Sequence, residues 1–119
     1  MQSIDLSFNE LTRIDCSIIK YPNIRSLYFH GNAIENFNEL KKLKDLNNLR
    51  RLTLHGNPIG NDSYLINVAH IYISEHIPQY RPRVINMLPG LKSFDFSGVT
   101  KNDRFVSNNI SLKKIKKTN

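Results

Sequence analysis

The stretch Leu49-Arg-Arg-Leu-Thr-Leu-His-Gly-Asn-Pro-Ile59 decides the fold, because the chain contains the same pattern 25 residues earlier. That earlier copy is Ile24-Arg-Ser-Leu-Tyr-Phe-His-Gly-Asn-Ala-Ile34, in which the apolar positions and the asparagine keep their offsets. Self-similarity at a fixed period is the sequence signature of a repeat protein, in which each copy is one structural unit. The sequence therefore predicts a stack of similar units.

The same pattern occurs in two further places. Ile4-Asp-Leu-Ser-Phe-Asn-Glu-Leu11 is a copy without its first apolar residue, and Ile4 precedes Leu27 by 23 residues. Leu91-Lys-Ser-Phe-Asp-Phe96 begins a fourth copy, in which Val99 stands in place of the asparagine. Periods of about 20–29 residues with this spacing are typical of leucine-rich repeats. We predict an α/β solenoid with a curved parallel sheet, a helical or irregular convex side and a helical C-terminal cap.

Alternation along each short strand separates core positions from surface positions. The apolar residues of the pattern point inward, and the residues between them point outward. The outward positions predict a concave face made of Ser3, Asp5, Ser7, Ser26, Tyr28, His30, Arg51, Thr53, His55, Ser93, Asp95 and Ser97. Aromatic and arginine side chains are frequent energetic anchors of interfaces. We predict that a partner protein contacts Asp5, Tyr28, His30, Arg51, Thr53, His55 and Asp95.

Asn9, Asn32 and Asn57 recur at one offset, where the chain must turn out of each strand. An amide side chain carries two donors and an acceptor, so it can satisfy the backbone groups of a buried turn. The alternative is a set of surface turn formers. Because the offset is constant, we predict that the three asparagines are structural.

The segments between the strands predict helices. An apolar residue at every third position indicates a short convex helix containing Phe37, Leu40, Leu43 and Leu46. A helical face that ends at Pro89 indicates the cap and contains Tyr80, Val84, Ile85 and Leu88. We divide the chain into a repeat domain, residues 1–106, and a basic disordered tail, residues 107–119. The domain holds repeats near 1–22, 23–46 and 47–62, an inserted helix at 63–78 and the cap at 79–106.

The blocks Leu52-Thr-Leu-His-Gly-Asn-Pro58 and Phe94-Asp-Phe-Ser-Gly-Val-Thr-Lys-Asn-Asp-Arg104 resemble the family of leucine-rich repeat-containing protein fifty-one. These are small intracellular proteins of ciliated eukaryotes, and the resemblance runs from about Ile4 to Arg104. More broadly, the chain is similar to outer-arm dynein light chain one, the spliceosomal A-prime protein and the regulatory repeat subunit of protein phosphatase one. The resemblance implies a non-catalytic protein binder of the ciliary or axonemal machinery. RNA-associated scaffolding, as in the spliceosomal relative, is the alternative.

The chain departs from this family in two ways. Residues 63–78 stand where the family has only a short linker. We interpret them as an extra helix or as a segment wrongly retained in the gene model. The chain also begins inside a repeat, so the resemblance implies a further repeat upstream. A strand at Ser3–Ser7 without that neighbour is expected to leave an open edge, which favours self-association.

Composition points to a reducing compartment and a soluble domain. Cys16 is the one cysteine, which we expect in the core, and no internal disulfide can form. We therefore predict the cytoplasm, and by resemblance the cilium or axoneme. No stretch approaches the roughly 20 apolar residues of a membrane helix. Four of the seven net positive charges come from the tail. We interpret them as a solvated terminus, with an RNA or acidic partner as the alternative, at Lys113, Lys114, Lys116 and Lys117.

The sequence predicts no enzyme, cofactor or metal site. His30 and His55 share one offset in neighbouring repeats, but a zinc site needs three or four protein ligands. We expect exposed, stacked imidazoles instead. Asp5, Ser7 and His30 carry the residue types of a hydrolytic triad but lack an oxyanion loop and a strained nucleophile turn.

Overall fold

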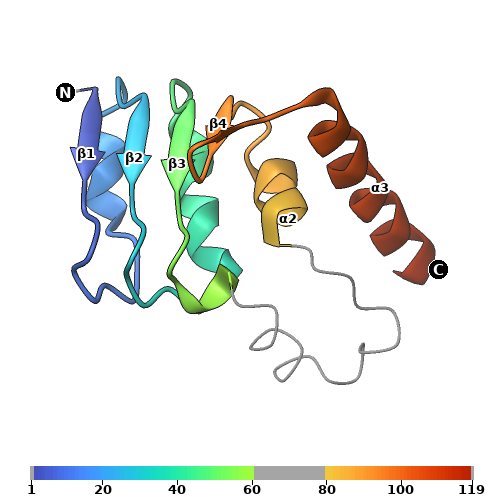
Figure 1. Ribbon diagram of the computed structural model, residues 1–119, viewed down its shortest axis with the longest axis horizontal. Coiled ribbons are helices and arrows are strands. Elements are labelled where there is room, and N and C mark those ends of the chain that lie inside the picture. The colour runs from blue at the N-terminus through green and yellow to red at the C-terminus, as the bar shows by residue number, and fades with distance from the viewer. Residues whose placement is uncertain (1, 61–79, 119) are drawn as a thin grey trace.

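The computed structural model describes residues 2–60 and 80–118, with side chains described as far as residue 109. The predicted inserted helix at 63–78 lies outside the described residues. Figure 1 shows the strands side by side, with short helices behind them. In the described part, the sheet has the order β1 (Ser3–Asp5), β2 (Ser26–Tyr28), β3 (Arg51–Thr53), β4 (Ser93–Phe94) and β5 (Ser97–Gly98).

The strands pair in the register that the repeat predicts. Neighbours β1 to β4 are parallel, and Leu27 faces Ile4 on one side and Leu52 on the other. Leu52 in turn pairs with Phe94, and β5 runs antiparallel to β4. Leu27, Leu52 and Phe94 are at most 1% exposed. The repeat pattern therefore fixes both the order of the strands and the side chains that enter the core, and the predicted fold class is confirmed.

The convex side is built from 3-10 helices: η1 (Cys16–Lys20), η2 (Phe37–Asp45) and η3 (Pro58–Gly60). A 3-10 helix has three residues per turn, so side chains three positions apart lie on one face. This explains the three-residue spacing of Phe37, Leu40 and Leu43, which are all buried. The side chain of Asn36 accepts from the backbone N–H of Asn38 and caps the start of η2.

The first return segment buries only some of its apolar side chains. Ile14 and Ile18 enter the core, but Ile19 and Tyr21 are 50% and 44% exposed. Cys16 is also exposed, so the expectation that it is a core residue is wrong. It begins a single short turn of 3-10 helix, of which only Ile18 is buried. One such turn presents one side chain to the core.

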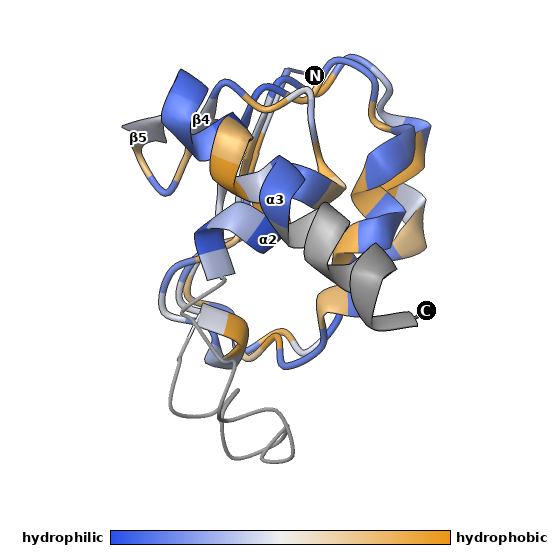
Figure 2. Cartoon of the chain, turned by 90° about the vertical axis from the view of Figure 1, so that its right-hand side faces the viewer, coloured by the Kyte–Doolittle hydropathy of each residue, from blue (hydrophilic) through white to orange (hydrophobic). Residues whose placement is uncertain are grey.

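Helices α2 (Tyr80–Met87) and α3 (Lys101–Thr118) lie across the C-terminal end of the sheet (Figure 2). Val84, Ile85 and Leu88 are buried beneath them, which confirms the predicted cap helix. The guanidinium of Arg81 donates to the carbonyls of Phe94 (2.9 Å) and Gly98 (3.0 Å). The cap is thus tied to the last strands by hydrogen bonds as well as by apolar contact.

Helix α3 corrects the prediction of a disordered tail from residue 107. Residues 107–118 continue the helix, and the side chain of Ser107 is 3% exposed. The guanidinium of Arg104 donates to the carbonyls of Pro89 (2.8 Å) and Leu91 (2.7 Å), which holds α3 against the end of α2. The sequence reading missed this docking because the segment has no clear apolar face. None of the helices among residues 2–60 and 80–118 has the length and apolar character needed to cross a membrane.

Candidate functional site

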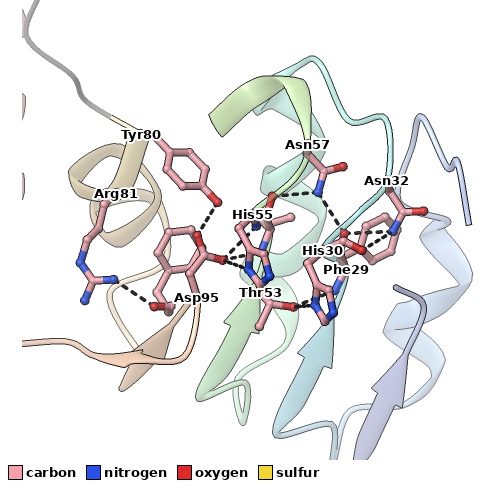
Figure 3. Close-up of polar contacts among 11 residues, drawn as sticks. Phe29, His30, Asn32, Thr53, His55, Asn57, Tyr80, Arg81 and Asp95 are labelled. Carbon is pink, nitrogen blue, oxygen red and sulfur yellow. Dashed lines mark hydrogen bonds and ion pairs between the residues drawn. The ribbon is translucent and has the colours of Figure 1, made fainter. Parts of the chain in front are cut away.

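Two of the three repeated asparagines are buried and join neighbouring repeats (Figure 3). The amide of Asn57 donates to the carbonyls of Leu54 (2.8 Å) and Phe29 (3.0 Å) and accepts from the N–H of Ile34 (2.9 Å). Asn32 likewise donates to Leu6 O (2.9 Å) and accepts from Leu11 N (2.9 Å). The predicted structural role is therefore confirmed for Asn32 and Asn57, because each amide satisfies buried backbone groups of two repeats.

Asn9 differs from the other two asparagines. It is exposed, and its amide donates only within its own turn, to the carbonyls of Leu6 (3.0 Å) and Ser7 (3.1 Å). Its backbone N–H donates to Asn32 Oδ1 at 3.0 Å. Asn9 therefore shapes the first turn, but the bonds that link this turn to the next repeat come from Asn32.

Aromatic and imidazole rings gather on the concave face at the C-terminal ends of the strands. We call this set the aromatic cluster: Phe8, Tyr28, His30, His55 and Phe96. The rings of His30 and His55 stack with centroids 4.6 Å apart and planes 6° from parallel. The ring of Phe8 meets His30 edge-on at 5.2 Å. Phe8 is 76% exposed and Phe96 is 68% exposed, so the cluster presents apolar ring surface to solvent.

Phe96 joins this cluster because the chain stops following the repeat pattern after Phe94. Asp95 and Phe96 adopt left-handed backbone conformations with φ of +50° and +64°, and the chain then reverses into β5. The ring of Phe96 stacks on Tyr28 at 6.0 Å and lies 5.7 Å from the ring of His55. The expectation that Phe96 occupies an inward position is therefore wrong. A local reversal that the repeat pattern does not contain turns its ring onto the concave face.

Phe8 occupies a strained backbone position. Its φ is +59°, and the equivalent positions in the next two repeats are Gly31 (φ +72°) and Gly56 (φ +74°). A left-handed conformation costs a residue with a side chain about 1–2 kcal/mol, whereas glycine adopts it freely. A β-carbon built at Gly31 would lie 2.4 Å from the Phe8 ring, so this ring covers the glycine of the next repeat. The sequence reading did not select Phe8, although its place at a glycine offset marks it.

The candidate Thr53 is wrong as a contact residue. It is 2% exposed, and its hydroxyl oxygen lies 2.7 Å from His30 Nδ1 and accepts from the N–H of Phe29 at 3.1 Å. The imidazole of the neighbouring repeat covers it. Thr53 instead fixes the orientation of His30 from below (Figure 3). His30 and His55 remain on the concave face as predicted, and their stacking is confirmed.

The carboxylate of Asp95 binds the backbone just after the C-terminal end of β3. Its Oδ1 accepts from the backbone N–H groups of Leu54 (2.7 Å) and His55 (3.0 Å) and lies 3.3 Å from His55 Nδ1. Its Oδ2 accepts from the hydroxyl of Tyr80 at 2.7 Å. Burial, together with this carboxylate, raises the pKa of Tyr80 above its ordinary value. Because the carboxylate is committed to these partners, the structure gives Asp95 a supporting role under His55.

Asp5 and Arg51 are exposed on the concave face, as predicted, and the half-buried Tyr28 pairs with Asp5, whereas Arg51 pairs with Ser26. Asp5 Oδ1 accepts from the hydroxyl (2.6 Å) and the N–H (3.0 Å) of Ser7, and these bonds lower the pKa of Asp5. Since Ser7 bonds directly to Asp5 and His30 Nδ1 faces Thr53, these contacts do not form a serine–histidine relay. In the part of the chain that the structure describes, three or more metal-ligating side chains nowhere come together.

The concave face combines apolar, polar and charged groups that can contact another macromolecule. The cluster offers flat apolar rings, two imidazoles and nearby charges of both signs, Asp5 and Arg51. Aromatic side chains bring a large buried area with little conformational entropy to lose. A face of this composition fits the apolar side chains of another macromolecule.

Comparison with known proteins gives the same fold. The family model described as leucine rich repeat matches residues 1–59. Leucine-rich repeat-containing protein 51 of Bos taurus is 43% identical over 95% of this chain and 54% of its own length. The Homo sapiens protein of that name is 45% identical over 85% of this chain and 45% of its own length. The chain thus spans about half the length of these relatives.

Two solved structures share the fold at lower identity. A chain in the crystal structure of the Drosophila melanogaster SNF/U2A' complex superposes with a TM-score of 0.70 at 23% identity, over 92% of this chain and 55% of that one. The Mex67 leucine-rich-repeat domain of Chaetomium thermophilum gives 0.62 at 22% identity, over 86% of this chain and 61% of that one. At this identity the likeness shows the architecture alone.

Proposed function

We propose that this chain is a non-enzymatic scaffold that binds a protein partner on its concave face. The match of residues 1–59 to the leucine-rich-repeat model and the similarity to leucine-rich repeat-containing protein 51 support this proposal. Repeat proteins of this kind use their curved sheets as extended binding surfaces. The aromatic cluster is the contact centre of the proposal, and Asp5 and Arg51 supply polar contacts beside it.

The exposure of Phe8 and Phe96 is the observation that supports this proposal. Both rings lie on the surface, and both residues have left-handed backbone conformations that cost free energy. Strained backbone persists where the surrounding structure demands it, and it gathers at functional sites. Folding gains little from two exposed phenylalanine rings, whereas a partner that covers them gains their apolar area.

The test compares two pairs of exposed side chains. A partner captured from the source cell is purified, and its dissociation constant is measured by fluorescence anisotropy for the native chain, for Tyr28→Ala/Phe96→Ala, and for Ile19→Ala/Tyr21→Ala. The control pair removes similarly exposed apolar groups from the first return segment. Central anchors cost about 2 kcal/mol or more when truncated, which corresponds to at least roughly thirtyfold in affinity. We expect that loss for the first pair only.

Equal binding by both double variants would reject the concave face as the contact surface. Thermal unfolding of each variant provides the necessary check, because all four side chains are partly or largely exposed. A change in affinity without a change in melting temperature then reports on the interface and not on folding.

An RNA-associated scaffold is the alternative function. The likeness to a chain of the SNF/U2A' complex and the net charge of +7 favour it. A salt titration separates the two functions, because phosphate contacts make the affinity fall steeply with salt and an apolar interface does not. Capture of the partner after ribonuclease treatment provides a second criterion.

The cytoplasmic location and a role in the cilium or axoneme are part of the proposal. The lone cysteine supports a reducing compartment, and the resemblance stated from the sequence supports the cilium. Localisation of the tagged chain in a ciliated cell tests both. Exclusion from the axoneme would remove the ciliary role and leave the binding surface unaffected.

A further inference from the structure

Three cations stand at the N-terminal ends of β2, β3 and β4. These strand ends lie at the upper end of the sheet in Figure 1. We call them the basic rim: Arg25, Arg51 and Lys92. The backbone ladder brings them close together. Arg50 N and Arg51 N both donate to Arg25 O at 2.9 Å, and Lys92 N donates to Arg50 O at 2.8 Å. Arg25 and Lys92 therefore flank Arg50, and Arg51 is the next residue along β3. All three side chains are exposed. Neighbouring strands are about 4.8 Å apart, so the row spans roughly 10 Å.

The fold does not neutralise this row. Within the described residues, the ion pairs join Lys42 to Glu39, His55 to Asp95 and Arg81 to Asp103, and none includes a cation of the basic rim. Like charges on adjacent strands are destabilising. The half-buried Arg50 lies inside the same row and donates to the carbonyls of Asn47 (2.9 Å) and Leu49 (3.0 Å). The row therefore concentrates positive charge that stability alone does not require.

Two depressions open beside the row. One has a volume of about 210 Å³ and is lined by Gln2, Asn23, Arg25 and Asn48, which come from three successive repeats. The other has a volume of about 470 Å³, lies between η2 and α2, and includes Lys44 and Arg50 in its wall. Both bring polar or cationic groups to the same rim. An anionic chain along the rim would meet hydrogen-bond donors as well as charge.

We propose that the basic rim binds an acidic peptide segment, rich in aspartate and glutamate, of the partner protein. The inference rests on the proposed function, because Arg51 belongs both to the rim and to the concave face that the partner covers. Arginine pairs with carboxylates through two parallel hydrogen bonds, which gives the rim geometric selectivity. A partner that places apolar side chains on the aromatic cluster continues over Arg51 onto the rim.

Charge and side-chain type favour a peptide over a nucleic acid. Proteins that bind single-stranded nucleic acid place aromatic platforms along their cationic groove, so that bases stack beside the phosphates. Here the aromatic cluster gathers around the C-terminal ends of the strands, and the described side chains that line the smaller depression are polar and not aromatic. A run of carboxylates can pair with such a rim without an aromatic platform beside it.

The test uses the full chain and labelled probes. An oligoglutamate peptide and an oligouridylate, each of about ten units, are titrated by fluorescence anisotropy at roughly 50 and 200 mM salt. The proteins are the native chain, Arg25→Ser/Arg51→Ser/Lys92→Ser, and the control Arg13→Ser/Lys41→Ser/Lys101→Ser. The control removes the same charge from exposed positions away from the rim. Arg51→Glu alone provides a second variant with minimal effect on folding.

We expect the native chain and the control to bind oligoglutamate, and the rim triple variant to lose at least tenfold in affinity. Arg51→Glu should lose several-fold, and higher salt should weaken binding. Equal losses in the rim and control variants, tighter binding of oligouridylate, or no oligoglutamate binding would each overturn the inference. Tyr28→Ala/Phe96→Ala should still bind oligoglutamate. If it does while partner binding proves insensitive to that double variant, the proposed function fails and the rim stands.

Discussion

The ring of Phe96 lies over the ring of Tyr28, with centroids 6.0 Å apart and planes 20° from parallel. This contact joins the C-terminal hairpin to the second repeat across the intervening β3. It closes the aromatic cluster on the side opposite Phe8. The aromatic cluster is therefore one continuous surface of side-chain rings, to which the first three repeats and the cap each contribute.

The contrast between Phe94 and Phe96 tests where the repeat frame ends. Phe94 is fully buried and Phe96 is 68% exposed. We expect Phe94→Ala to lower the free energy of unfolding by about 3–5 kcal/mol, and Phe96→Ala to change it by less than about 0.5 kcal/mol. Urea denaturation measures both. The reverse ranking would show that Phe96 is a core residue and would contradict its place in the aromatic cluster.

The asparagines should differ in their effect on stability. Asn57→Ala and Asn32→Ala each leave buried carbonyls and N–H groups without partners, so we expect losses of about 1–3 kcal/mol. Asn9→Ala should cost less than about 1 kcal/mol, because its amide is exposed to water. Equal losses for Asn9 and Asn57 in chemical denaturation would contradict this assignment.

Replacing Phe8 by glycine separates strain from binding. The left-handed backbone at Phe8 costs about 1–2 kcal/mol, and glycine removes this cost while adding conformational entropy to the unfolded chain. We expect Phe8→Gly to stay within about 1 kcal/mol of the native free energy of unfolding and to bind the partner more weakly. Gly56→Ala is the control, with an expected loss of about 1–2 kcal/mol. A strongly destabilised Phe8→Gly would show that the ring serves folding.

Asp103 should contribute to the acid stability of the cap. Its hydrogen bonds with Arg81, and also with Thr100, lower its pKa from 3.8 to about 2. The folded-state pKa lies below the unfolded one, so this contribution is complete above about pH 4 and is lost as the pH falls toward 2. Asp103→Asn should flatten the stability curve between these values. If the pH dependence of stability is unchanged in that variant, Asp103 does not contribute to the acid stability of the cap.

The parts of this structure that follow the repeat could be predicted, and the parts that leave it could not. Leu27, Leu52 and Asn57 obey a pattern with one physical cause per offset, so their positions follow from the sequence. Phe96 departs because the backbone is left-handed at its offset, a conformation that the equivalent residues Phe29 and Leu54 do not share. Thr53 is buried, although its position in the strand predicts exposure, because the imidazole ring of His30 from the neighbouring repeat covers it. Alternation along one strand does not reveal such a contact.

The tail shows a further limit of sequence patterns. Helix α3 is held by Arg104, whose guanidinium group donates to the carbonyls of Pro89 and Leu91 in the cap. Such bonds between side chain and backbone leave no periodicity in the helix that they anchor. A charge-rich segment therefore reads as a solvated terminus even where its first turns dock.

The most direct test of the concave surface is a titration of the purified partner followed through the side-chain resonances of this chain. We expect the ring signals of Phe8, Tyr28 and Phe96 and the imidazole signals of His30 and His55 to shift or broaden together. Phe105, which is 64% exposed on α3, should remain unperturbed and serves as the internal reference. Perturbation of Phe105 with unchanged signals from the aromatic cluster would contradict the account and move the interface to the cap.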